Sequence, residues 1–147
     1  MCFFYKCIEQ FNKNNEKYEI KDGNGKVLEY YDSGELEFEG EYLNGEINGK
    51  GKEYFKNGKL EFEGEYLNGE KNGKLIEYFP DGKIKFEGEY LNGKRNGKGK
   101  EYNDKGKLIF EGEYLNGDKW YGKGKEYDDY GKLIFEGKYL NDIKVLK

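Results

Sequence analysis

The sequence predicts an all-β protein, built as an elongated, single-layer antiparallel sheet of tandem β-hairpin repeats. The string Phe-Glu-Gly-Glu-Tyr-Leu-Asn-Gly occurs four times and once more in altered form, at intervals of 24 or 25 residues. Apolar or small residues alternate with charged ones inside the string, which is the period of a strand with one covered face. Glycine recurs in every link between such runs, as tight turns require. The strings start at Phe38, Phe62, Phe86, Phe110 and Phe135.

The repeats divide the chain of 147 residues into two parts. Counting 24 residues back from Tyr42 reaches Tyr18, so a degenerate first unit begins there. We therefore assign residues 16–147 to the repeat array and residues 1–15 to an N-terminal cap or tail. Apolar residues in that segment follow i, i+3, i+4, i+7 spacing, which predicts a short amphipathic helix over the first hairpin, with a frayed tail as the alternative. They are Phe4, Cys7, Ile8 and Phe11.

Each repeat contains two strands and two links. Residues 60–66 alternate strictly and predict a strong strand, and residues 50–55 predict a second, weaker one. Residues 56–58 join them and end in a glycine, which suits the left-handed residue that follows a type I turn. We predict a three-residue hairpin loop with a glycine bulge at this link. The second link, residues 68–73, is predicted to be longer and bounded by glycines.

The choice of turn decides which side chains share a face of the sheet. In the bulged register Tyr54 lies opposite Leu60, and one face is predicted to collect Tyr54, Leu60, Phe62 and Tyr66. The glutamates between them occupy the other face. Lys50 and Lys52 then fall on the aromatic side, with their stems over the rings and their amines in water. A two-residue turn would instead exchange Tyr54 for Phe55.

The C-terminal end of the array is predicted to be an open edge. Asp142 replaces the usual glycine, and residues 143–147 have an extended pattern. An unpaired edge strand is a template for another chain. We therefore expect that two copies can form a homodimer through edge strands or through a sheet face.

The composition excludes most enzyme mechanisms. The chain has no histidine and no threonine, and Ser33 is its single serine, so neither a Ser-His-Asp triad nor a Cys-His pair can form. Two cysteines cannot supply the four thiolates of a structural zinc site. Repeated, similar glutamates do not offer the two unlike carboxyl environments that glycoside hydrolysis needs. We predict no enzymatic activity, no catalytic residue, no metal site and no cofactor.

Aromatic residues are the candidate partner-binding residues. One tyrosine per repeat forms a ladder that is either the hydrophobic face of the sheet itself or a strip open to a partner, because a single layer has nothing opposite it. The ladder consists of Tyr42, Tyr66, Tyr90, Tyr114 and Tyr139. Trp120 and Tyr121 interrupt the repeat in a segment one residue longer than its counterparts. An exposed tryptophan is a good interface anchor, and folding back onto a neighbouring ring is the alternative.

The net charge of −4 narrows the choice of partner. A net acidic chain with one arginine is a poor ligand for nucleic acid, and it is not strongly attracted to anionic membranes. A local basic patch is the candidate contact for lipid or another anion, and consists of Lys94, Arg95, Lys98 and Lys100. No stretch reads as a signal peptide or a transmembrane segment, so we expect a cytoplasmic protein, with peripheral membrane contact as the alternative.

The repeated string, followed by Gly-x-Gly and then by Asp-Gly or Asn-Gly, resembles the MORN repeat (membrane occupation and recognition nexus) over residues 18–140. The Glu-Tyr before the hairpin glycine resembles in particular the bacterial and protist variant of the repeat, which includes antitoxin-like proteins. The resemblance implies a ribbon of hairpins that scaffolds, dimerises or tethers, and some relatives are linked to phospholipids. We therefore expect a non-enzymatic scaffold that binds protein. Contact with phospholipid head groups and an antitoxin- or immunity-type role are the alternatives.

Overall fold

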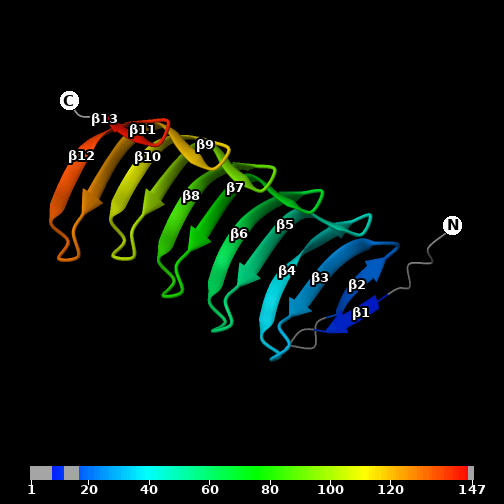
Figure 1. Cartoon of the computed structure of the whole chain (residues 1–147). Coiled ribbons are helices and arrows are strands. Elements are labelled where there is room, and N and C mark those ends of the chain that lie inside the picture. The colour runs from blue at the N-terminus through cyan, green and yellow to red at the C-terminus, as the bar shows by residue number, and fades with distance from the viewer. Residues whose placement is uncertain (1–7, 12–16, 146–147) are drawn as a thin grey trace.

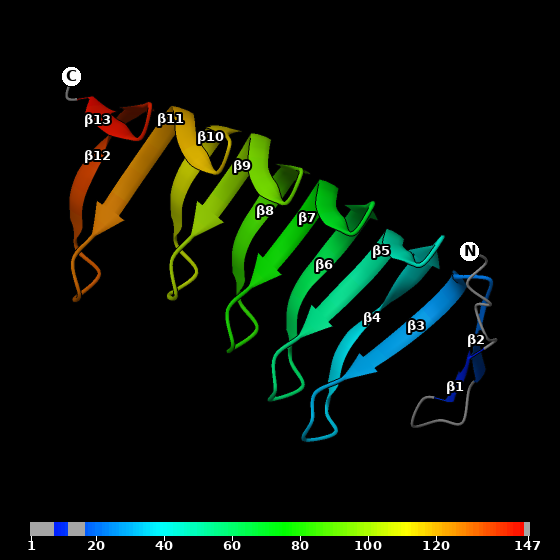
Figure 2. The same cartoon turned by 45° about the vertical axis from the view of Figure 1, so that its right-hand side comes forward.

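A computed structural model describes residues 8–11 and 17–145 of the chain. In them, thirteen strands form one antiparallel sheet in which each strand pairs with its neighbours in sequence. The strands lie side by side along an elongated ribbon and are bowed rather than flat (Figures 1 and 2). The predicted all-β, single-layer fold is confirmed. The strands are β1 (Ile8–Phe11), β2 (Lys17–Lys21), β3 (Asn24–Tyr30), β4 (Leu36–Leu43), β5 (Glu46–Tyr54), β6 (Leu60–Leu67), β7 (Glu70–Tyr78), β8 (Ile84–Leu91), β9 (Lys94–Tyr102), β10 (Leu108–Leu115), β11 (Asp118–Tyr127), β12 (Leu133–Leu140) and β13 (Ile143–Val145).

The predicted N-terminal helix is wrong where the structure describes that segment. Ile8–Phe11 is strand β1, which pairs with β2 and places Ile8 opposite Ile20. A short isolated helix is marginal in water, whereas the first strand of the array offers backbone partners for an extended segment. Phe4 and Cys7 lie outside the described residues. The division of the chain after residue 15 stays a prediction.

The loop at residues 56–58 has the bulged form that the sequence predicts. The Gly58 amide donates to the Phe55 carbonyl at 2.8 Å, and the Phe55 amide donates to the Lys59 carbonyl at 2.8 Å. Gly58 has a φ of 77°, which is the left-handed residue of this turn. The same two hydrogen bonds recur in the next three hairpin loops, which form a row along one side of the ribbon (Figure 2).

The second link is shorter than predicted. Strand β6 ends at Leu67 and β7 begins at Glu70, so Asn68 and Gly69 alone turn the chain. Their φ values are 51° and 81°, and a type I′ turn needs positive φ at both central positions. The Gly69 amide also donates to the Ile47 carbonyl at 2.9 Å, which ties this turn to the preceding repeat.

A second irregularity beside the hairpin loop decides the composition of the two faces. Tyr54 lies opposite Leu60, as predicted, but the register then shifts so that Glu53 lies opposite Phe62. Tyr54 therefore does not share a face with Phe62, and its hydroxyl donates to Glu39 on the other face at 3.3 Å. The predicted aromatic face is wrong for Tyr54 and for Leu60 opposite it, because a bulge shifts the register by one residue.

The predicted position of Lys50 and Lys52 on the aromatic side is also wrong, because of the same bulge. Lys50 lies opposite Glu65, and Lys52 lies opposite Glu63, on the face away from the buried rings. Their stems do not cover the aromatic residues. We call the face with the buried rings the core face and the face with these glutamates and lysines the groove face.

The core is a chain of aromatic rings on one side of the sheet. Phe62 and Phe110 are 1% exposed and Phe86 is 0% exposed, although the protein has a single layer. Phenylalanine and tyrosine rings alternate edge to face with centroids 5.1 to 6.0 Å apart, an arrangement that aromatic pairs prefer. The chain runs through Phe38, Tyr66, Phe62, Tyr90, Phe86, Tyr114, Phe110, Tyr139 and Phe135.

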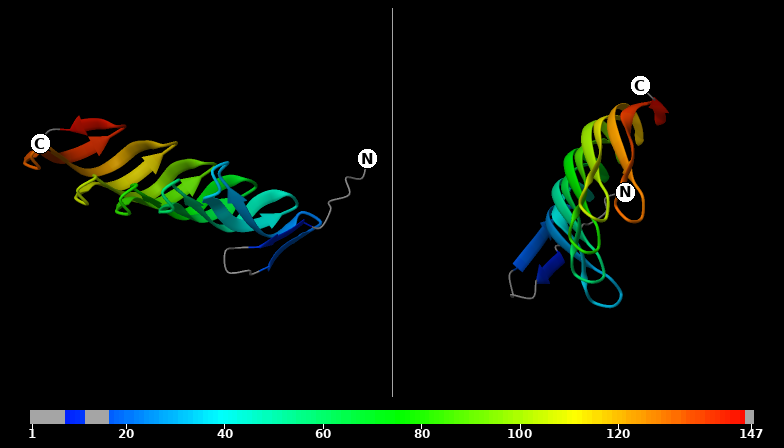
Figure 3. Two further views of the ribbon diagram at one scale, coloured as in Figure 1. Left: turned by 90° about the horizontal axis from the view of Figure 1, so that it is seen from below. Right: turned by 90° about the vertical axis from the view of Figure 1, so that its left-hand side faces the viewer.

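The ribbon twists along its length, and each repeat is rotated relative to the one before it (Figure 3). Glycines allow the rings to lie close to the backbone. A Cβ atom on Gly99 would lie 2.6 Å from the Phe86 ring, and one on Gly51 would lie 2.8 Å from the Tyr66 ring.

Candidate functional site

A row of cations covers the core face. Lys71 Nζ lies 3.5 Å from the centroid of the Phe62 ring, and Arg95 Cζ lies 4.1 Å from that of Phe86. The ring face attracts a cation, and the aliphatic stem keeps water from the ring. Side chains thus take the place of a second layer. The other members of the row are Lys119 over Phe110 and Lys144 over Phe135.

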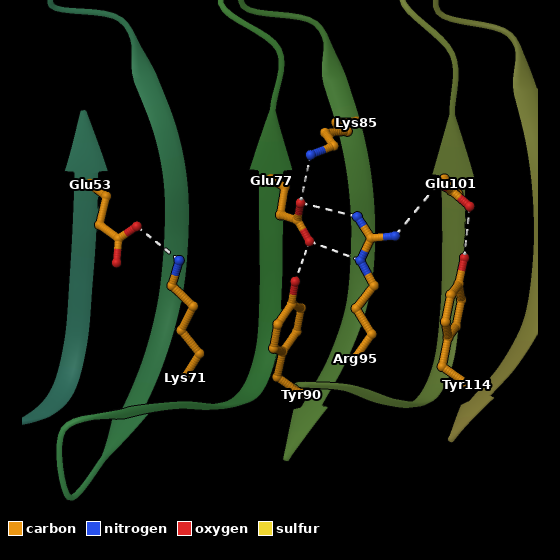
Figure 4. A network of polar contacts seen from close by, with 8 residues as sticks. All are labelled: Glu53, Lys71, Glu77, Lys85, Tyr90, Arg95, Glu101 and Tyr114. Carbon is orange, nitrogen blue, oxygen red and sulfur yellow. Dashed lines mark hydrogen bonds and ion pairs between the residues drawn. The ribbon is translucent and has the colours of Figure 1, made fainter. Parts of the chain in front are cut away.

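A glutamate holds each of these cations. Glu77 accepts hydrogen bonds from Arg95 Nε at 2.9 Å, from Arg95 Nη2 at 3.0 Å and from the Tyr90 hydroxyl (Figure 4). Burial raises the pKa of Glu77, but the hydrogen bonds from Arg95 and Tyr90 outweigh it and hold that pKa below its usual value. The same set of tyrosine, glutamate and cation recurs as Tyr66, Glu53 and Lys71, as Tyr114, Glu101 and Lys119, and as Tyr139, Glu126 and Lys144.

The first repeat departs from this arrangement. The Tyr42 hydroxyl donates to Glu29 at 2.6 Å, but Ile47 stands where the later repeats have lysine or arginine. Ile47 packs against the cluster of buried rings instead. An apolar side chain can therefore fill the covering position at the end of the row.

The tyrosine ladder belongs to the core. Tyr66, Tyr114 and Tyr139 are 5%, 3% and 6% exposed, and Tyr42 and Tyr90 are partly buried. Each hydroxyl is already bonded to a glutamate, so a partner on this face would meet the covering cations before the rings. The geometry supports the interpretation of the ladder as the sheet's own hydrophobic face, and a role in partner binding stays a prediction.

Stability is expected to fall at alkaline pH. Burial, together with hydrogen bonds to Glu63 and Glu87, raises the pKa of Tyr78 and of Tyr102 from 10.0 to about 12. The unfolded chain therefore loses these phenolic protons first as the pH rises. The stabilisation is complete below pH 10 and is lost as the pH rises to about 12. Urea midpoints measured across this range should fall steadily.

The matched variants for this prediction are Tyr78→Phe and Tyr130→Phe. The first removes a bonded hydroxyl and should flatten the alkaline slope, whereas Tyr130 is 96% exposed and its variant should leave the slope unchanged. A urea midpoint that stays constant through this alkaline range would contradict the prediction.

The groove face is open and hollowed. A groove of about 1250 Å³ runs along it from β3 to β12, lined by glutamates and lysines and floored by the glycine backbone. In its central part, one row of charges crosses the strands with strictly alternating sign. The row consists of Glu41, Lys50, Glu65, Lys74, Glu89, Lys98 and Glu113, and we call it the alternating row.

The charges of the alternating row are less engaged than those of the core face. Lys50 lies opposite Glu65, and Lys98 lies opposite Glu113, yet none of the seven side chains makes an ion pair with any residue that the structure describes. The neighbouring Lys100 lies 3.8 Å from Glu87. The groove face therefore presents both signs of charge with unused bonding capacity.

Trp120 and Tyr121 lie inside strand β11 rather than in a loop, so the predicted longer loop is wrong. The extra residue lengthens β11 to ten residues, where β5, β7 and β9 have nine. The register shift between Glu113 and Tyr114 has counterparts beside Tyr42, Tyr66 and Tyr90 in the preceding hairpins. Glu113 of β10 lies opposite Tyr121 of β11 and, in the other direction, opposite Lys98 of β9, so the three side chains share the groove face. The alternating row therefore ends at a tyrosine.

An apolar patch follows at the C-terminal end of the groove face. Tyr121 lies opposite Leu140, and Leu140 lies opposite Ile143, so the three share one face. They are 52%, 49% and 66% exposed, and the adjacent Trp120 is 43% exposed. We call Tyr121, Leu140 and Ile143 the end patch. Sequence reasoning singled out Tyr121 but missed its two neighbours, because only the strand register brings them together.

The predicted basic patch is split between the two faces. Arg95 lies on the core face, bonded to Glu77, with its side chain 17% exposed. Lys98 and Lys100 lie on the groove face, and Lys100 lies between Glu87 and Glu111. Lys94 is exposed opposite Leu91. These four cations do not form a single surface for an anion.

In residues 8–11 and 17–145 no helix has the length and apolar character to span a membrane. The same residues contain no group of three or more acidic or cysteine side chains arranged to hold a metal ion.

The fold and these two faces define a class of protein: a single-layer β-hairpin repeat ribbon, with one face closed by its own side chains. The profile of the MORN repeat matches residues 38–59 and 86–107, and the profile of the MORN repeat variant matches residues 23–44 and 71–92. The chain belongs to the MORN repeat family, whose repeats are commonly modules for interaction with proteins or membranes. No curated protein matches the chain.

Proposed function

We propose that this chain is a non-enzymatic scaffold that binds a protein partner along its groove face, with Trp120 and Tyr121 as the anchor. The difference between the two faces carries the proposal. On the core face the rings are covered, and Glu77 and its counterparts are bonded. On the groove face the alternating row is unengaged, and the end patch is exposed.

The end patch and the adjacent Trp120 together have the composition of an interface centre. Tryptophan and tyrosine are enriched among the residues that dominate binding energy, because they bury large areas with few rotatable bonds. Trp120 and Tyr121 are both about half exposed, beside Leu140 and Ile143. The expected aromatic contact therefore moves from the tyrosine ladder to this end of the groove. An antitoxin- or immunity-type role would be one case of such protein binding.

Membrane contact has less support. The alternating row places positive and negative side chains on neighbouring strands of the groove face. Arg95 lies on the opposite face from Lys98 and Lys100. A surface of mixed sign is weakly attracted to anionic lipid. Sedimentation with vesicles at low salt, with and without anionic lipid, tests this alternative. Pairing of two copies at the β13 edge and a cytoplasmic location stay predictions, which light scattering and cell fractionation can check.

The double variant Trp120→Ala with Tyr121→Ala is expected to weaken partner binding at least tenfold while leaving the melting temperature within a few degrees. Truncating two exposed anchor residues removes contact area at the interface but no core packing. The partner is first captured with the intact chain and identified by mass spectrometry. Its Kd is then measured by calorimetry against the intact and the variant chains.

Tyr130→Ala is the matched control, since Tyr130 is exposed in a hairpin loop away from the groove. Equal affinities of the partner for the double variant and for Tyr130→Ala would contradict the proposed site. Tyr114→Ala is unsuitable as a binding variant because Tyr114 is 3% exposed and its loss would unfold part of the ribbon.

A further inference from the structure

Resting on the proposed function, we infer that the segment seated in the groove is an α-helix of the partner whose charges alternate in sign from one turn to the next. The alternating row supplies the template. Its seven charges change sign at every strand, from Glu41 to Glu113, and the end patch follows at Tyr121.

The spacing of the alternating row matches the turn of a helix. Neighbouring strands lie ~4.8 Å apart. Successive turns of a helix lie ~5.4 Å apart, so charges at i, i+3 or i+4, and i+7 drift from the row by only ~0.6 Å per strand. Long lysine and glutamate side chains absorb such a drift. Residues on one side of an extended chain recur every ~6.7 Å and slip out of phase after two or three strands.

Backbone hydrogen bonding also favours a helix. Every strand from β2 to β12 is paired on both sides, so most of its amides and carbonyls are engaged within the sheet. An extended peptide in the groove would find no backbone partners and would leave its own polar groups unbonded. A helix satisfies its backbone internally and needs only side-chain contacts.

The dimensions of the groove agree with this occupant. Six strand intervals span ~29 Å, which is the length of ~19 helical residues. The partner helix is therefore expected to present about seven charges, complementary in order to the alternating row, followed by apolar residues that rest on Tyr121 and Leu140.

The test uses synthetic helical peptides and the full chain. Two probes carry lysine and glutamate at alternating turns in complementary order, with a Leu-Trp pair at the amino end of one and the carboxyl end of the other. A block peptide has the same composition, with all lysines in one half and all glutamates in the other. An extended peptide alternates the charges at every second residue and contains glycine. Fluorescence anisotropy gives each Kd, and circular dichroism reports helix content.

We expect one alternating peptide to bind at least tenfold more tightly than the block peptide. This preference should weaken between ~0.05 M and ~0.5 M salt, because exposed charge pairs are screened. Lys74→Glu, in the centre of the alternating row, should reduce the affinity of the chain for that alternating peptide at least tenfold. Lys132→Glu makes the same change in net charge at a hairpin loop outside the groove and should leave the affinity unchanged.

The inference would be overturned by equal binding of the alternating and block peptides, by tighter binding of the extended peptide, or by equal effects of the two lysine variants. Self-association of the chain that Lys74→Glu abolishes would also overturn it, by assigning the groove to a second copy. The proposed function fails separately, if the natural partner is indifferent to loss of Trp120 and Tyr121.

Discussion

Replacing Phe86 with alanine is expected to reduce the free energy of unfolding by about 3 to 5 kcal/mol, the usual cost of emptying a fully buried aromatic site. Phe86 is 0% exposed. Its ring packs edge to face against Tyr90 and Tyr114 at centroid distances of 5.8 and 5.2 Å, and Arg95 lies over it at 4.1 Å. The substitution breaks the chain of rings and uncovers the arginine. Urea denaturation followed by circular dichroism measures the loss.

The position of Phe86 adds a second expectation. A repeat array is stabilised by its nearest-neighbour interfaces, so a defect in β8, near the middle of the ribbon, should divide one cooperative transition into two. Leu91→Ala is the control, because Leu91 lies on the same strand and is 50% exposed. It should change stability by no more than about 0.5 kcal/mol. Similar losses from the two variants would show that the ring chain is not the core.

Gly88→Ala is expected to destabilise the chain by about 1 to 3 kcal/mol, because overpacking forces the backbone to move. A Cβ atom on Gly88 would lie 2.7 Å from the Gly99 Cα atom, 2.7 Å from the Lys98 carbonyl oxygen and 2.6 Å from the Phe86 ring. Two of these three atoms belong to the backbone of β9, so strands β8 and β9 must separate. Chemical denaturation gives the change in the free energy of unfolding.

Gly99→Ala provides the matched comparison. A Cβ atom on Gly99 would meet ring atoms of Phe86 and Tyr114 as its nearest neighbours, at 2.6 to 3.1 Å. Side chains can be trimmed, whereas the backbone of β9 cannot. Adding Phe86→Leu should therefore recover part of the cost of Gly99→Ala and little of the cost of Gly88→Ala. Equal recovery in the two double variants would contradict the backbone explanation.

Local patterns predicted most of the fold. The alternation at residues 60–66 and the glycine at Gly58 are features of neighbouring residues, and they predicted strand β6 and the bulged loop correctly. The Asn68-Gly69 turn is also local, but its length was overestimated, since both residues sit in left-handed conformations and need no further residues.

The assignment of side chains to faces failed at the second bulge. The register shift between Glu53 and Tyr54 depends on pairing with β6, so the local sequence pattern does not predict it. The row of cations on the core face was not predicted, because its contacts also join residues far apart in the sequence. Lys71 covers Phe62 and bonds to Glu53, which lies 18 residues earlier in the chain.

The sequence by itself determined that this chain is a ribbon of hairpins, since that architecture follows from the repeated string. The tertiary structure alone decided which face is closed. Strand register is set by hydrogen bonds between segments far apart in sequence, and a shift of one residue moves a side chain to the other face. That register buries the tyrosine ladder, aligns the alternating row from Glu41 to Glu113, and joins Tyr121 to Leu140 and Ile143.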